Sequence, residues 1–238
     1  MNMKIIMTDE RISPECERSL LKEGFYLIKM PPDPYLGEAV ASHPDTLAFF
    51  DGGELITTAD YCDNASYVFS DVREYRPDVK LTFTADKRGK IYPEDCAMNA
   101  LVIGNKIFCR TDCISRVVLD HAKRQGYSIV HTAQGYPTCT VLAFGGSAVT
   151  ADCGMAKILH NEGISVTLIR PGEISLPPYE YGFIGGASFV DSKKVYFFGD
   201  ISTHPDADII LDAIHREGYE AVSLSSEMLT DLGGAILL

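Results

Sequence analysis

The sequence predicts an α/β fold in which five copies of a strand, helix and strand unit form a five-bladed α/β propeller with pseudo-fivefold symmetry. Three observations favour this fold: a recurring strand that ends in aspartate, a following helix that ends at glycine, and chain ends that complete one another. With 238 residues, of which 46% are hydrophobic, the chain is long enough to bury a sizeable core.

Five β-like segments end in a small or hydroxyl residue followed by aspartate. They are Lys4–Asp9, Leu55–Asp60, Ile107–Asp112, Ala148–Asp152 and Val195–Asp200. Successive aspartates lie roughly 40 to 52 residues apart, and the step from the last one round to the first is similar. We therefore predict a single domain, 1–238, with repeats at approximately 9–59, 60–111, 112–151, 152–199 and 200–238 plus 1–8.

A helical pattern follows each aspartate and ends at glycine in four of the five copies. These segments are Ser13–Gly24, Cys113–Gly126, Cys153–Gly163 and His204–Gly218. Glycine after a helix supplies the left-handed conformation that lets the chain turn into the next strand. In the second copy we expect Pro77 to end a shorter helix. The five aspartates stand where strand gives way to helix, so we predict that they cap helix N-termini.

The second half of each unit is predicted to be a β-hairpin. Turn residues occur at Asp51–Gly53, Gly104–Lys106, Gly145–Gly146 and Asp191–Lys193, but a fifth turn is missing. In its place Leu232–Leu238 ends the chain, and Met3–Met7 begins it at the matching point. We expect these two strands to pair and close the ring without leaving an open sheet edge. A doubly wound α/β domain is the alternative, because it also alternates strands with helices.

The composition limits the classes of function. The formal net charge is -12, which disfavours nucleic acid and anionic membranes as partners. The N-terminus does not resemble a signal peptide and no apolar stretch is long enough to span a bilayer, so we expect a cytoplasmic protein. Seven cysteines form no regular framework, and no second Cys or His pair lies near Cys109 and Cys113. We therefore predict neither a metal site nor a cofactor.

The repeats, the joints between helix, glycine and strand, and the Gly–Gly pairs at 185–186 and 233–234 resemble the pentein fold of guanidino-group-modifying enzymes. The resemblance covers essentially the whole chain. It extends to arginine deiminase, dimethylarginine hydrolase and the ribosome anti-association factor, so it implies the architecture more than the activity.

In such a ring, the first strand of each hairpin would face a central channel, and polar residues at its start are the functional candidates. By repeat, they are His43 and Asp45; Asp95 and Asn99; Tyr136 and Cys139; Tyr181; and Asp231. The resemblance implies a carboxylate that holds a guanidinium, a His-x-Asp one repeat later, and a cysteine nucleophile two repeats beyond the histidine. Asp231, His43 with Asp45, and Cys139 match these steps.

We accordingly predict Cys139, His43 and Asp231 as catalytic residues, and Asp45, Asp95, Asn99, Tyr136 and Tyr181 as substrate-binding residues. The reaction would be hydrolysis of, or transfer from, a small guanidino compound. In the enzymes, however, the cysteine lies in the last repeat, so here the catalytic set would be rotated around the ring. Other interpretations stay open: His43 as a turn residue, Cys139 as a packing residue, and the whole protein as a non-catalytic ring that binds a protein or small ligand.

Overall fold

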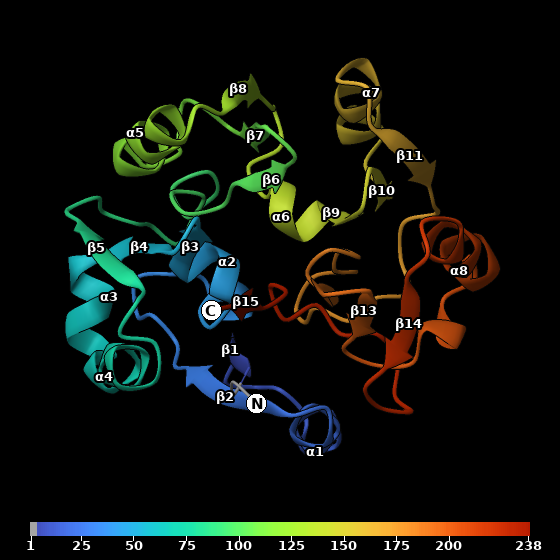
Figure 1. The fold of residues 1–238 in the computed structure, drawn as a ribbon, viewed down its shortest axis with the longest axis horizontal. Helices are drawn as coiled ribbons and strands as arrows, with labels where there is room; N and C mark the ends of the chain where they lie inside the picture. The colour runs from blue at the N-terminus through green and yellow to red at the C-terminus, as the bar shows by residue number, and fades with distance from the viewer. Residues whose placement is uncertain (1–3) are drawn as a thin grey trace.

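The computed structural model describes residues 4–238, and within this range the strands form five three-stranded sheets. The sheets lie around a common centre, with the longer helices on the outside (Figure 1). Residue 3, the start of the predicted N-terminal strand, lies outside the described residues. Within residues 4–238, no helix is long and apolar enough to cross a membrane.

Every sheet has the same topology: the first strand pairs antiparallel with the second, and the second pairs parallel with the third. The first strands are β3 (Ala48–Asp51), β6 (Leu101–Ile103), β9 (Val141–Phe144), β12 (Ser188–Asp191) and β15 (Ile236–Leu237). The second strands are β4 (Glu54–Thr58), β7 (Lys106–Cys109), β10 (Ser147–Thr150), β13 (Lys194–Phe197) and β1 (Lys4–Asp9). The third strands are β5 (Lys80–Thr84), β8 (Ser128–His131), β11 (Ser165–Leu168), β14 (Glu220–Ser223) and β2 (Phe25–Met30). The four predicted hairpins are confirmed.

Helices connect the second strand of each sheet to the third. They are α1 (Pro14–Lys22), α3 (Ala59–Asn64) with α4 (Ser66–Tyr75), α5 (Arg116–Gln125), α7 (Cys153–Asn161) and α8 (Ala207–Arg216), the last preceded by the 3₁₀ turn η2 (Ile201–Thr203). Shorter helices, η1 (Glu38–Val40), α2 (Pro44–Leu47) and α6 (Pro137–Thr140), lie before β3 and β9.

The ends of the helices match the sequence in part. Gly126 ends α5 in the left-handed conformation, with φ 78°, and the glycines after α1, α7 and α8 also have positive φ. Asp152 and Asp200 accept backbone N–H groups as N-caps, as predicted. The prediction is wrong for Asp60 and Asp112, because Thr58 and Ser115 cap those helices instead.

Apolar packing joins each unit to its neighbours. Five buried clusters occur among residues 4–238, and each draws side chains from two successive sheets and from a helix of the second. One cluster, for example, combines Ile5 and Ile236 with Leu55 and with Phe69 of α4. A single unit therefore leaves much of its apolar surface uncovered without its neighbours.

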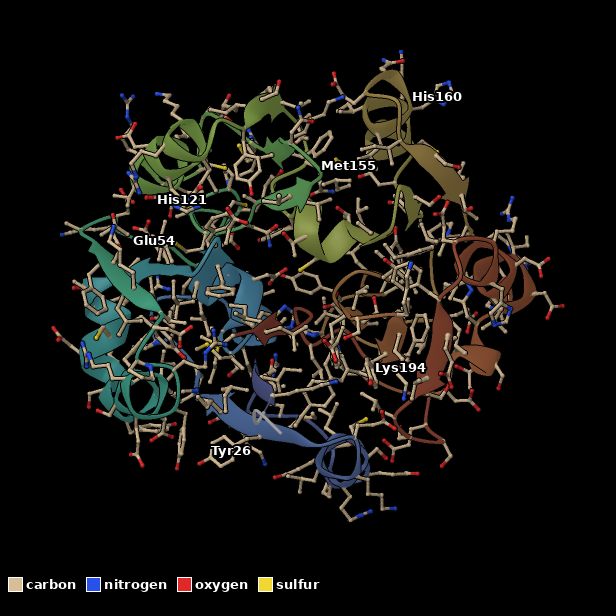
Figure 2. The ribbon with its side chains drawn as sticks, in the orientation of Figure 1. Tyr26, Glu54, His121, Met155, His160 and Lys194 are labelled. Carbon is tan, nitrogen blue, oxygen red and sulfur yellow. The ribbon has the colours of Figure 1, made fainter. Side chains whose placement is uncertain are left out.

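Polar contacts repeat at the same junctions, several of them at residues labelled in Figure 2. His121 of α5 bonds Glu54 at the start of β4, with 3.1 Å between Nδ1 and Oε2. The bonds at the other four junctions are Lys106–Glu162 at 2.9 Å, Ser147–Glu217 at 2.7 Å, Lys194–Glu23 at 2.7 Å and Tyr26–Tyr75 at 3.3 Å. Each unit is thus tied to the next by packing and by a polar contact.

The last strand of the chain pairs with the first described strand. Ile236 lies opposite Met7, and Leu237 lies opposite Ile6, in an antiparallel register. The predicted pairing of the N- and C-terminal strands is therefore present, and it sets the direction in which the preceding segment, 231–235, approaches β1.

Replacing Ile236 tests how much this pairing stabilises the protein. Ile236 is 9% exposed and packs in the cluster with Ile5 and Leu55. We expect Ile236→Ala to lower the free energy of unfolding by about 2–5 kcal/mol, measured by urea denaturation. Ile209→Ala, at a 49% exposed position on α8, is the control and should change it by less than about 0.5 kcal/mol. Equal effects of the two substitutions would contradict this account of the pairing between β1 and β15.

Candidate active site

The three predicted catalytic side chains stand just before first strands of different sheets. His43 directly precedes α2, Cys139 lies within α6, and Asp231 lies ahead of β15. Polar atoms of His43, Asp45 and Cys139 all lie within 4.8 Å of one another. Asp231 Oδ1 is 3.9 Å from His43 Nδ1. The fold therefore brings together residues that are almost 190 positions apart in the sequence.

Cys139 is buried beside a carboxylate and an amide. Its thiol donates a hydrogen bond to Asp45 Oδ2 at 2.5 Å, and Asn99 Nδ2 donates to the same oxygen at 2.8 Å. Burial raises the pKa of the Cys139 thiol well above its usual range, and the negative charges of Asp45 and Asp231 raise it further. In the protein alone, the thiol is therefore protonated at neutral pH.

The two carboxylates are also buried, and their pKa values rise for the same reason. Burial raises the pKa of Asp45 to about 7 and that of Asp231 to about 6. Asp231 accepts hydrogen bonds from the backbone N–H groups of Phe183 and Gly233, at 2.8 and 3.0 Å. Oxygen Oδ1 of Asp45 has no hydrogen-bond partner among residues 4–238. Such a cluster of carboxylates is suited to a cation.

His43 is fully buried between two carboxylates. Its Nε2 is 3.9 Å from Asp9 Oδ2 on one side, and its Nδ1 is 3.9 Å from Asp231 on the other. Neither ring nitrogen has a hydrogen-bond partner in the described part of the chain. Burial, assisted by the charge of Arg11, lowers the pKa of His43 to about 3. The imidazole is therefore neutral at pH 7 and has both nitrogens available.

Asp9 is a residue of the site that the sequence interpretation missed. We predicted a helix cap, but Ser13 caps α1, and Asp9 is 0% exposed and faces His43. Its carboxylate is held by Arg11, with 2.6 Å between Oδ2 and Nη2. A signal was present: Asp152 directly precedes its helix, whereas Asp9 stands several residues before Pro14.

A cavity of about 400 Å³ opens beside these groups. Cys139, His43 and Asp231 line it, together with the predicted binding residues Asp95, Tyr136 and Tyr181; its other lining residues are Val40, Lys90, Tyr92, Gln134, Leu176, Tyr179, Glu180 and Phe183. The hydroxyl of Tyr136 donates to Asp95. Asp45 and Asn99, which we also predicted to bind substrate, do not line this cavity. They instead contact Cys139, because they lie behind it.

Glycines, which have no side chain, leave room for the side chains of Asp231 and His43. A Cβ atom at Gly186 or Gly182 would collide with the carboxylate side chain of Asp231, and one at Gly233 would collide with His43. Gly233 also has φ 67°, a conformation that other residues rarely adopt. One glycine of each Gly–Gly pair noted in the sequence, Gly186 and Gly233, is therefore needed to assemble the site.

Within residues 4–238, one cluster of three side chains has donor atoms close enough to hold a metal ion. Its members are His43, Asp45 and Cys139. One nitrogen, one oxygen and one sulfur are donors that zinc accepts. The site contains three such donors, and its short thiol–carboxylate hydrogen bond satisfies two of them without a metal.

The order of strands and helices, and the placement of these residues ahead of first strands, define a protein with the pentein fold. Solved structures with this fold include an amidinotransferase of saxitoxin biosynthesis from Microseira wollei, 13% identical over 94% of this chain and 89% of that one, TM-score 0.55. A DDAH from Pseudomonas aeruginosa, complexed with citrulline, is 11% identical over 100% of both chains, TM-score 0.58. An inosamine-phosphate amidinotransferase from Streptomyces griseus is 13% identical over 94% of this chain and 79% of that one, TM-score 0.56.

At these identities, the likeness establishes the fold. By sequence, the chain belongs to the family described as "Family of unknown function (DUF6873)", whose model matches residues 7–236. No curated protein matches the chain.

The raised pKa of Asp45 predicts a pH-dependent stability. Because its pKa is about 7 in the folded protein and near 4 when unfolded, the folded state binds more protons in this window, and stability falls as pH rises from 4 to 7. Asp45→Asn cannot ionise and retains an oxygen for Cys139. Between pH 4 and 7, we expect the free energy of unfolding of this variant to fall less than that of the wild type. The difference is at most roughly 4 kcal/mol, at about 1.4 kcal/mol per pKa unit.

The measurement is urea unfolding at several pH values between 4 and 8. Asp63→Asn, at an exposed position, should keep the pH dependence of the wild type. An Asp45→Asn curve that is parallel to the wild-type curve would show that Asp45 ionises normally in the fold.

Proposed function

We propose that this protein is a cysteine-dependent enzyme acting on a small guanidino compound, either as a hydrolase or as an amidinotransferase. The observation that carries the proposal is that Cys139, His43 and Asp231 together line a cavity of about 400 Å³. The likeness to amidinotransferases and to a DDAH complexed with citrulline supports the same reaction class.

A planar cation would complete the charge balance of the site. Asp231 faces the cavity with a raised pKa, so a guanidinium beside it favours its ionised form. The same positive charge favours the Cys139 thiolate. Burial raises the pKa of the thiol because a lone anion is unfavourable there, and pairing the thiolate with a cation reduces that penalty. Substrate binding would therefore generate the nucleophile, and the thiol proton would pass to Asp45, which already accepts its hydrogen bond.

The covalent steps follow from this arrangement. The thiolate attacks the guanidino carbon and forms a C–S bond; the C–N bond to the leaving amine then breaks as the amine takes up a proton. The proton that Asp45 accepted from the thiol reaches the leaving amine through His43, which is neutral at rest. In the second step His43 accepts a proton from the attacking water or amine, and the carboxylates of Asp9 and Asp231 stabilise its cationic form. Water, or an acceptor amine, then displaces the thiolate.

The remaining residues divide into two groups by position. Asp95, Tyr136 and Tyr181 line the cavity, so we assign them to substrate binding. Asp45 and Asn99 hold the Cys139 side chain from behind and act as positioning residues. Asn99 also accepts a hydrogen bond from the backbone N–H of Thr138, at 2.9 Å, which fixes the segment that carries Cys139.

We further propose that the five repeats form a single domain and a closed five-bladed propeller. Two features support this: the β1–β15 pairing, and the polar contacts found at the junction between every pair of successive sheets in the described chain. Closure allows the catalytic set to occupy repeats five, one and three, in the order that the resemblance implies.

Turnover of a panel of guanidino compounds tests the activity. We expect release of an amine with a ureido product, or amidination of an added amine, by the wild-type protein. Cys139→Ser should reduce the rate about 10³-fold or more, since the nucleophile is lost. Cys153→Ser, at an exposed cysteine, is the matched control and should retain wild-type activity.

A chelator separates this mechanism from a metal-dependent one. The activity should be unchanged by EDTA, because the side chains supply both nucleophile and proton transfer. Loss of activity with EDTA and its recovery with zinc would contradict the proposed roles of Cys139 and His43, and so would a fully active Cys139→Ser variant.

A further inference from the structure

Two other cysteines lie in contact outside the catalytic set. The thiols of Cys96 and Cys113 are close enough for each to shift the pKa of the other, although they stand in different loops and donate their hydrogen bonds to Asp95 and to the backbone of Arg110. Cys96 is 1% exposed, whereas Cys113 is partly exposed, and both are free thiols. The mechanism proposed for Cys139 uses neither of them.

The backbone holds the two loops side by side. The N–H of Ser115 donates to the carbonyl oxygen of Ala97 at 2.8 Å, which joins the residue after Cys96 to the start of α5. Each cysteine also lies in a hydrogen-bonded turn: Cys96 N–H bonds to Pro93 at 3.2 Å, and Cys113 N–H bonds to Arg110 at 3.1 Å. The fold therefore holds the two loops that carry these thiols next to one another.

We propose that Cys96 and Cys113 are a redox modification site, at which a hydroperoxide converts the two thiols to a reversible disulfide. The Cys113 thiolate attacks the peroxide oxygen, the O–O bond breaks and Cys113 becomes a sulfenic acid. The Cys96 thiol then attacks this sulfur and forms the S–S bond. With hydrogen peroxide, two thiols and one peroxide yield one disulfide and two water molecules.

The two cysteines have different roles in this reaction. The neighbouring Cys96 thiol lowers the pKa of Cys113, and the positive charge of Arg110 lowers it further, while the pKa of Cys96 is raised by Cys113 and by burial. The partly exposed Cys113 is thus the thiolate that a peroxide reaches, and the buried Cys96 is the resolving thiol. Cys109 is nearby but fully buried in β7, and burial raises its pKa to about 11.

The disulfide would act on the loop that supports the catalytic cavity. Cys96 follows Asp95, and its thiol donates to Asp95 Oδ1 at 3.4 Å. The same loop carries Asn99, which holds Asp45 behind Cys139. Oxidation removes the S–H donor to Asp95 and ties this loop covalently to the turn before α5.

Peptide mapping tests the proposal, because trypsin places the three neighbouring cysteines in separate peptides. They are residues 91–106, 107–110 and 111–116, containing Cys96, Cys109 and Cys113 respectively. The folded, reduced full chain is treated with hydrogen peroxide, alkylated, and digested without reductant. We expect a peptide pair joining 91–106 to 111–116, which disappears after treatment with dithiothreitol.

Two variants provide the controls. In Cys113→Ser, Cys96 should remain a free thiol after peroxide treatment. In Cys96→Ala, Cys113 should accumulate as a sulfenic acid that a 1,3-dicarbonyl reagent traps. Cys153→Ser should still form the linked peptide. The proposal is overturned if the linked pair forms only in denaturant, if Cys96 stays reduced in the folded wild type, or if Cys109 is the partner.

Discussion

The antiparallel pairing of β15 with β1 is the constraint on which the candidate site depends, because it places Asp231 beside His43. The two residues come from opposite ends of the sequence, and their side chains are 3.9 Å apart. Each junction around the molecule is held in the same manner, by an apolar cluster shared between successive sheets and a polar contact. The short segments before the first strands are thereby fixed, and these segments carry His43, Cys139 and Asp231.

The cost of this arrangement is electrostatic. Asp9, Asp45 and Asp231 are all buried around a neutral histidine, and the charges of Asp45 and Asp231 raise the pKa of the Cys139 thiol. Arg11 compensates the charge of Asp9, and backbone amides compensate that of Asp231, but Asp45 Oδ1 has no hydrogen-bond partner within residues 4–238. A site that disfavours its own anions binds a cation with a large electrostatic gain. The packing between the sheets must offset the unfavourable free energy of burying these carboxylates.

Much of the fold could be predicted because its signals are local. Hairpin turns, glycines after helices and an aspartate at each strand end are read within a few residues, and the structure confirms them at Gly126 and Asp152. The choice of His43, Cys139 and Asp231 came from the resemblance to pentein enzymes, whose order of functional residues was matched to the repeats of this chain. Local signals could not show which way a side chain faces: Asp9 turns inward instead of capping α1, and Asp45 lies behind the thiol instead of facing the cavity. Those outcomes depend on neighbouring sheets.

The most direct test of the central claim uses a matched pair of alkylating reagents. Chloroacetamidine carries a planar cation that resembles a guanidinium, and chloroacetamide has the same electrophilic carbon without the charge. If a bound cation generates the Cys139 thiolate, the amidine should alkylate Cys139 at least about tenfold faster than the amide. Peptide mass mapping over time measures both rates, with Cys153 as the exposed reference. Equal rates for the two reagents at Cys139, or a Cys139 that neither reagent modifies in the folded protein, would contradict the account.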